Sequence, residues 1–401
     1  MTPFRIGDSL YESLDQVPSA VIEAAYQDKL RPLCQCTTAG VPLYIAKRES
    51  KHFVKRMPDS GPTHDSGCAY FEPPPGLSGL GEVQGTAIQE DPESGIVKLR
   101  FDFSLSKSAG KTASPPGTSE PGETIEGEPT KLTLSATLDY LIEEAGLNRW
   151  VPAMAGKRNW YVIRAAIRDA AAAMTARAGD LSDLLFIPET FAAERKIEIQ
   201  GRRLAALSRI TSGEGAGRRM MLALVEVKSF QPSRYGYRLV AKHLPDFPFI
   251  VPDDLHRRME KRFGAALGLW DAHEGTHLLC LATFSVGTNG LATIGAMTLR
   301  VADKNWLTAR DGYELTLLDH LTSNGRRFIQ GMRYNLSPAK PVAAVTLSDC
   351  QDLHAIFVLP PAAPESYREA LAHLLEESAV PASTWEVERG FPHLPAPEGR
   401  Q

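Results

Sequence analysis

Apolar positions in this chain recur at helical spacing in some stretches and follow strand-like patterns in others. Leu134, Leu138 and Leu141 would share one face of a helix, which Gly146 would end. On such grounds helices are predicted over residues 132–145, 160–178, 190–210, 252–270, 313–324 and 365–378. Strands are predicted over residues 41–47, 52–55, 82–90, 95–103, 221–230, 237–242, 277–286, 291–301, 328–334, 341–347, 355–359 and 384–388.

This succession of elements predicts a multidomain α+β protein. The expected sections are a small zinc-ribbon-like β module, a flexible linker, a helical basic segment, a central α/β region and a C-terminal α/β domain, over residues 1–103, 104–131, 132–215, 216–305 and 306–401. Residues 104–131 are rich in Ser, Thr, Gly, Pro and Glu and have almost nothing apolar after Leu105. Such a segment cannot bury enough surface to order itself, which is why a linker is predicted there.

Composition narrows the class of protein further. Of 401 residues, 43% are hydrophobic and 23% charged, which is ordinary for a globular protein and excludes a wholly disordered or fibrous chain. The net charge of −4 gives no overall basic field. Five cysteines at low density argue against a disulfide scaffold and for a reducing compartment. With neither a signal peptide nor a membrane-spanning stretch evident, we expect a cytoplasmic protein that does not contact membranes.

The strongest chemical signal is a cluster of cysteines near the N-terminus. Cys34 and Cys36 form one close pair, and His64 and Cys68 form a second pair after the predicted hairpin. Two close pairs separated by a hairpin suit the tetrahedral coordination of Zn²⁺ by sulfur and nitrogen. Four protein ligands leave no place for a reactive water, so the predicted zinc site is structural and not catalytic. The ion would stabilise a module with few apolar residues of its own.

Two alternatives to this ligand set stay open. His52 also lies between the two cysteine pairs and could replace His64 as the fourth ligand. The cysteines could also be reduced, unconnected thiols, because Cys-x-Cys is a less specific motif than Cys-x-x-Cys.

Several motifs resemble a bacterial family of domains of unknown function that is defined by three N-terminal cysteines. They are the cysteine motif with His64, Lys55-Arg56-Met57-Pro58, Gly146-Leu147-Asn148-Arg149-Trp150, Gly156-Lys157-Arg158, Tyr235-Gly236-Tyr237-Arg238-Leu239 and Arg333-Tyr334-Asn335-Leu336. The resemblance covers most of the chain. It implies zinc-type ligands at Cys34, Cys36 and Cys68 and proteins often carried on plasmids or integrative elements. It implies no activity.

Basic residues concentrate in the predicted helical segment. Between residues 149 and 219 there are 13 Lys or Arg and 7 Asp or Glu, an excess of six positive charges. A helix–turn–helix unit would use such residues on DNA. The candidate nucleic-acid contacts are Arg149, Lys157, Arg158, Arg164 and Arg168. We favour the alternative that this is an ordinary helical section with solvated arginines, because the connection between its helices is long for a helix–turn–helix.

Two further motifs have the composition of metal-dependent hydrolases. His273-Glu274-Gly275-Thr276-His277 matches the zinc-protease pattern, but it is predicted to join a helix to a strand, where the two histidines cannot share one helical turn. Glu226 and Lys228 on a strand match half of a nuclease signature. The first carboxylate of that signature has no convincing counterpart, and an exposed strand edge explains the pair more simply.

The predicted order of elements from Glu314 onward is similar to a restriction-endonuclease-like fold. The strands that would carry its acidic residues, 341–347 and 355–359, are apolar, so any such domain would have lost its metal site. A generic α/β domain is the alternative.

Together these features predict a zinc-binding accessory protein of a bacterial mobile element. It would associate with DNA or RNA, or with a protein partner, without catalysis. The alternative function is a metal-dependent nuclease or related hydrolase that uses Glu226 and Lys228, with Glu314 as a further acid.

Overall fold

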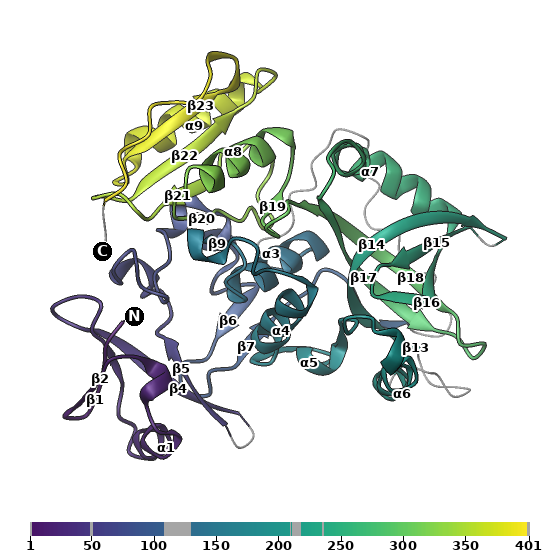
Figure 1. Cartoon of the computed structure of the whole chain (residues 1–401), viewed down its shortest axis with the longest axis horizontal. Helices are drawn as coiled ribbons and strands as arrows, with labels where there is room; N and C mark the ends of the chain where they lie inside the picture. The colour runs from purple at the N-terminus through teal and green to yellow at the C-terminus, as the bar shows by residue number, and fades with distance from the viewer. Residues whose placement is uncertain are drawn as a thin grey trace.

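A computed structural model describes residues 2–48, 51–107, 130–208, 210, 218–234 and 236–398. The predicted α+β class is confirmed, because helices and several separate sheets are interspersed along the described chain. Figure 1 shows three sheet-containing regions around a central group of helices, α3 (Leu134–Glu144), α4 (Trp160–Ala171) and α5 (Leu181–Leu184). Most of the predicted linker, residues 108–129, lies outside the described residues.

The N-terminal region is a five-stranded antiparallel sheet in the order β2–β1–β3–β4–β5. Its elements are β1 (Phe4–Ile6), β2 (Ser9–Tyr11), α1 (Ser19–Gln27), β3 (Leu33–Cys34), β4 (Val41–Arg48) and β5 (Lys51–Arg56). The predicted hairpin is formed by β4 and β5, and α1 packs against both strands. Its core includes Cys34 and Cys68 beside Leu43 and Phe71.

A second sheet connects the N-terminal third to the central helices. Its strands are β6 (Ile88–Glu90), β7 (Val97–Leu99), β10 (Met174–Ala176) and β11 (Gly179–Asp180), with helix α2 (Leu80–Val83) just before β6. Strand β7 pairs in parallel with β10, although segment 108–129 separates them in the sequence. The predicted helix over 160–178 therefore stops at Ala171, because Met174 and the two residues after it pair with β7.

A barrel forms the largest sheet. Its elements are β12 (Leu185–Phe186), α6 (Lys196–Leu207), β14 (Met221–Ser233), β15 (Gly236–Ala241), β16 (Leu244–Val251), α7 (Asp253–Ala272), β17 (His277–Val286), β18 (Ala292–Ala302) and β19 (Thr308–Ala309). Five strands close in the order β14–β15–β16–β18–β17, because β17 also pairs with β14. Only the β16–β18 pairing in this ring is parallel. A separate antiparallel pair is formed by β8 (Ser106–Lys107) and β13 (Arg218–Arg219), and β13 directly precedes β14 in the sequence.

Strands β14 and β17 of the barrel are buried on both faces, because their side chains alternate between the barrel interior and the central helices. Phe249, Phe284 and Val227 point inward into an apolar core that Met259 of α7 also contacts. Leu222 and Leu281 point outward from β14 and β17 into the core shared with α3 and α4. The β14–β17 side is therefore covered by the central helices, whereas β15 and β16 lie on the other side of the barrel (Figure 1).

The C-terminal region is a sheet in the order β23–β22–β21–β20–β9. Its elements are β9 (Arg149–Trp150), α8 (Gly312–Ser323), β20 (Phe328–Gln330), β21 (Val345–Leu347), β22 (His354–Leu359), α9 (Glu365–Glu377) and β23 (Ala382–Glu386). Because β9 separates α3 from α4 and joins this distant sheet, those helices do not form a helix–turn–helix. Strands β21 and β22 are apolar, as expected, and the restriction-endonuclease-like interpretation stays a prediction.

None of the helices in the described ranges combines the length and the apolar character needed to cross a lipid bilayer.

Candidate metal centre

Three cysteines and one histidine meet beside the N-terminal sheet. Cys34 ends β3, and Cys36 follows it in the turn toward β4. His64 caps the short 3-10 helix Gly61–Thr63, and Cys68 lies in the next turn. Because the β4–β5 hairpin lies between the two pairs, the chain leaves the first pair and returns to the second. The structure thus brings together the four residues that the sequence analysis named.

The four ligand atoms have the spacing of a coordination site. All of them lie within 4.8 Å of one another. The Sγ atoms of Cys34 and Cys68 are 3.6 Å apart, and His64 Nδ1 lies 3.3 Å from Cys36 Sγ and 3.7 Å from Cys68 Sγ. Within the described residues this is the one group of three or more His, Cys, Asp or Glu side chains placed so that it could hold a metal ion.

Backbone N–H groups hold two of the sulfur atoms in place. The N–H of Asp65 donates to Cys36 Sγ at 3.4 Å, and the N–H of Tyr70 donates to Cys68 Sγ at 3.4 Å. The Asp65 carboxylate accepts the N–H of Gly67 and so shapes the turn between His64 and Cys68. Hydrogen bonds of this kind orient ligands and favour the thiolate form that binds metal.

Two of the four side chains, Cys68 and His64, are already in the form that binds metal. The hydrogen bond from the Cys34 thiol lowers the pKa of Cys68 to about 5, so Cys68 is a thiolate at neutral pH. The same hydrogen bond raises the pKa of Cys34, which retains the shared proton. Burial lowers the pKa of His64, whose ring is therefore neutral and can offer a lone pair. A thiolate and a neutral imidazole are the forms in which these side chains bind metal.

His52, the alternative fourth ligand, is not part of the group. It lies on β5, where its ring packs against Tyr26 of α1 with 4.9 Å between ring centroids. The side chain at this position contributes to the packing of α1 on the hairpin.

Comparison with family models places the whole architecture in one family. Residues 4–388 match the model described as "Protein of unknown function (DUF1173)". The chain belongs to this family. The match confirms the resemblance inferred from the sequence motifs, and it assigns no activity. A search of curated proteins found no match, and neither did a search of solved structures.

Two of the arginines named as nucleic-acid contacts are used inside the protein. The guanidinium of Arg149 donates to the carbonyl of Phe71, and burial lowers the pKa of Arg149. Arg158 donates to the carbonyls of Leu147 and Arg149 and lies over the ring of Trp150. These contacts connect β9 to neighbouring segments and leave little of either guanidinium for a ligand.

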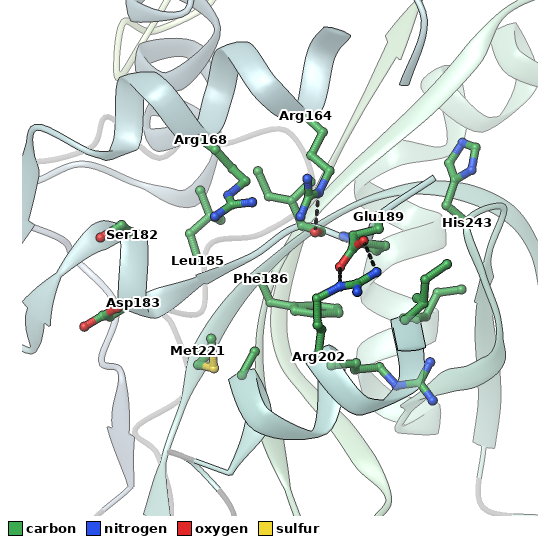
Figure 2. Close-up of a pocket in the computed structure, with 16 residues that line it drawn as sticks. Arg164, Arg168, Ser182, Asp183, Leu185, Phe186, Glu189, Arg202, Met221 and His243 are labelled. Atoms are coloured by element: carbon green, nitrogen blue, oxygen red, sulfur yellow. Dashed lines mark hydrogen bonds and ion pairs between the residues drawn. The ribbon is translucent and has the colours of Figure 1, made fainter. Parts of the chain in front are cut away.

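The other three candidates lie nearer the surface. Lys157 is exposed before α4. Arg164 and Arg168, one turn apart on α4, line a cavity of about 310 Å³ (Figure 2). Arg202 and Arg203 of α6 line the same cavity but were not singled out from the sequence. The high basic content of residues 149–219 was the available signal, and only the fold shows which of those residues converge.

Glu226, one of the two residues that match the nuclease signature, belongs to an internal ionic cluster. Glu226 is 3% exposed, and its carboxylate lies 2.6 Å from His277 Nδ1, 2.6 Å from Lys242 Nζ and 3.4 Å from His243 Nε2. Lys228 is exposed on β14, at a bulge in its pairing with β15. Glu314, the further acid, lies in the first turn of α8 and pairs with Arg310, which precedes that helix. The three side chains do not converge on a common point.

The zinc-protease pattern is divided between two elements. His273 caps the end of α7, and His277 begins β17. Gly275 between them has φ +81°, which no helical turn contains. The expectation that these histidines do not share a helical face is confirmed.

Proposed function

We propose that the chain is a zinc-stabilised protein that binds single-stranded nucleic acid and has no catalytic activity of its own. The resemblance to proteins carried on plasmids and integrative elements supports an accessory role in handling the nucleic acid of a mobile element, in the bacterial cytoplasm. The closed barrel is the observation that carries the binding function.

Zinc is the ion that best suits the metal centre. With Zn–S bonds of ~2.3 Å and Zn–N bonds of ~2.0 Å, a tetrahedral site has ligand atoms roughly 3.5–3.8 Å apart. The distances of 3.6, 3.3 and 3.7 Å among Cys34, Cys36, His64 and Cys68 agree with this size. Three sulfur atoms and one imidazole are a common structural zinc set, and they leave no coordination position for substrate. A bound zinc would hold the two arms of the N-terminal region together.

The barrel has the arrangement of the oligonucleotide- and oligosaccharide-binding (OB) fold. In chain order its strands are β14, β15, β16, β17 and β18, and the first pairs with both the second and the fourth. The third and fifth strands pair in parallel, and α7 lies between the third and fourth strands. Proteins of this fold bind single strands across the outer face of their second and third strands.

That face remains open in this protein. The outward side chains of β15 and β16 alternate with the inward Leu239 and Phe249. Those on the outer face and on the adjoining part of β14 are Lys228, Ser229, Gln231, Arg238, Val240 and Ile250. They offer two cations, hydrogen-bonding groups and an apolar centre, which is the mixture that a phosphate backbone and its bases require. Lys228 and Arg238 give this face two positive charges, and the carboxylate of Asp246, also exposed on β16, already pairs with Arg203 of α6.

The internal cluster around Glu226 favours binding without catalysis. A nuclease would need that carboxylate to hold Mg²⁺ together with a second acid. Here Lys242, His243 and His277 already surround it. The ammonium group of Lys242, which is ion-paired to this carboxylate, would compete with Mg²⁺ for it.

The test measures fluorescence anisotropy of labelled single-stranded DNA, single-stranded RNA and duplex DNA of equal length. We expect single strands to bind more tightly than the duplex, with affinity that falls steeply as salt rises. Arg238→Ala should weaken binding and reduce the salt slope by about one. Arg257→Ala, an exposed arginine on α7, is the matched control and should change neither. Absence of binding to every strand, or cleavage of DNA in magnesium, would contradict the proposal.

A further inference from the structure

A basic cavity opens beside the barrel. It has a volume of about 310 Å³ and lies between α4, the segment around β12, α6 and the β15–β16 turn. Figure 2 shows Arg164 and Arg168 reaching into it from α4, with Arg202 on the opposite wall and His243 at one side. The volume is at the lower end of the range for small-molecule sites, so it suits one compact group.

The charges around this cavity do not balance. Four arginines line it against two carboxylates, Asp183 and Glu189. Arg202 makes a bidentate pair with Glu189, at 2.7 and 2.8 Å, and Arg203 pairs with Asp246 just outside the lining, at 2.9 and 3.2 Å. These pairs fix the arginines of α6 in place and neutralise them.

The two arginines of α4 are differently placed. Arg164 donates one N–H to the carbonyl of Ile187 at 3.1 Å, which orients its guanidinium and leaves its other N–H groups toward the cavity (Figure 2). The guanidinium of Arg168 has no hydrogen bond or ion pair with any described residue, although the backbone carbonyl of Arg168 accepts the N–H of Ala172 within α4. Burial and the nearby charges of Arg168 and Arg202 lower the pKa of Arg164, as expected where cations gather without a matching anion. An anion between Arg164 and Arg168 would remove that repulsion.

An exposed aromatic ring stands next to this pair. Tyr161 is 67% exposed, and it precedes Arg164 by three residues and Arg168 by seven on α4. This spacing puts all three side chains on one helical face. An exposed ring adjoining an anion site is the arrangement with which proteins stack a base while holding the neighbouring phosphate.

We propose that this cavity binds one backbone phosphate of a single-stranded nucleic acid, held between Arg164 and Arg168, while Tyr161 stacks on an adjacent base. The nucleic-acid source of the phosphate rests on the proposed function, whereas the anion site itself stands on the cavity. A strand that crosses β15 and β16 reaches the site past the β15–β16 turn, since His243 of that turn lines the cavity. A phosphate bound in this cavity would hold the nucleic-acid strand in place next to the exposed face of β15 and β16.

The experiment compares inorganic phosphate and a labelled single-stranded oligonucleotide as probes. Arg168→Ala should weaken oligonucleotide binding about tenfold and abolish the ability of phosphate to compete for the site. Arg257→Ala, at an exposed arginine of α7 outside the cavity, is the matched control and should leave both unchanged. Tyr161→Ala should weaken the oligonucleotide about tenfold but leave phosphate binding unaffected, and Tyr161→Phe should restore the affinity. Thermal melting of each variant shows that it is folded.

The outcomes separate the two proposals. Full oligonucleotide affinity in folded Arg168→Ala, still sensitive to Arg238→Ala, would overturn the phosphate site and leave the barrel function standing. Phosphate binding that requires Arg168, without affinity for any oligonucleotide, would overturn the proposed function and the base-stacking role of Tyr161. Binding of neither probe would overturn both.

Discussion

The N-terminal sheet and the barrel obtain their cohesion from different sources. The barrel strands are long, and large side chains such as Phe249 and Phe284 fill its interior. In the N-terminal sheet β1, β2 and β3 are two or three residues long, and two cysteines belong to the core. A large apolar interior stabilises a fold without help, whereas a small core commonly depends on a metal or a disulfide.

The comparison also explains where each region can carry function. Coordination by Cys34, Cys36, His64 and Cys68 would use every ligand position of the ion, so the metal centre can hold the chain but has no position for a substrate. The outward side chains of β15 and β16, unlike those of β14 and β17, are not part of a buried core, so the face at Arg238 is available for binding. We therefore expect that substitutions at the metal centre reduce stability and that substitutions on the barrel face reduce binding.

The largest expected effect comes from removal of the metal. Structural zinc contributes of order 10 kcal/mol to the folding of small domains. Purified protein should hold one zinc, and Cys34→Ser should hold none. Amide hydrogen exchange should then become fast in β1–β5 while β14 and β17 stay protected. Cys280→Ala, at a buried cysteine inside the barrel, is the matched control and should keep its zinc.

Two results of that experiment would contradict the proposed difference between the N-terminal sheet and the barrel. Protection of β1–β5 that survives the loss of zinc would show that the N-terminal core suffices by itself. Retention of zinc by Cys34→Ser would show that the four clustered side chains are not the ligands.

The reverse experiment removes part of the barrel core. Phe284 is fully buried and contacts the rings of Phe186 and Phe249. Phe284→Ala should cost about 3–5 kcal/mol of barrel stability, because it leaves a cavity in a close-packed interior. Hydrogen exchange should speed up in β14–β18, and zinc content should be unchanged. Phe53→Ala, at a half-exposed site on β5, should have little effect in the same assay. Unfolding of both regions together would show that they are one cooperative unit.

The two regions also differ in how far the sequence predicts them. Cys34, Cys36, His64 and Cys68 could be grouped from the sequence because each pair is local and a recognisable hairpin separates the pairs. Four of the five barrel strands were predicted one by one with nearly correct limits, but β16 was not predicted, and neither was the closure of the barrel. Closure depends on the pairing of β14 with β17 and of β16 with β18, which no local pattern encodes.

Contacts between residues far apart in the sequence account for the remaining differences between the predictions and the structure. Met174 continues the apolar spacing of α4, and only the presence of β7 beside it turns that segment into a strand. Arg149 and Arg158 look like surface cations in the sequence, but carbonyl groups of distant or neighbouring segments accept their hydrogen bonds. Charge and spacing in the sequence indicate candidate binding residues, but burial in the fold determines which of them a ligand can reach.

The smallest expected effect concerns the ionic cluster that connects β14 and β17 of the barrel to the β15–β16 turn. Burial alone would raise the pKa of Glu226, but hydrogen bonds from His243, His277 and Lys242 hold it well below its usual value of 4.5. A carboxyl group with a lowered pKa stabilises the fold above pH 4.5, and this contribution is lost as the pH falls toward the folded-state pKa. Glu226→Gln should therefore cost about 2 kcal/mol at neutral pH.

The pH dependence separates this charge effect from a simple packing effect. The stability difference between wild type and Glu226→Gln, measured by urea unfolding, should be constant above pH 6 and narrow steadily below pH ~4.5. Glu198→Gln removes an exposed carboxylate on α6 and should show almost no difference at any pH. A Glu226→Gln deficit that stays constant down to pH 3 would mean that the amide disturbs packing and that the ionic cluster adds nothing. A deficit that narrows shows instead that the buried charge connects β14 to the β15–β16 turn, beside the cavity where the nucleic-acid phosphate is proposed to bind.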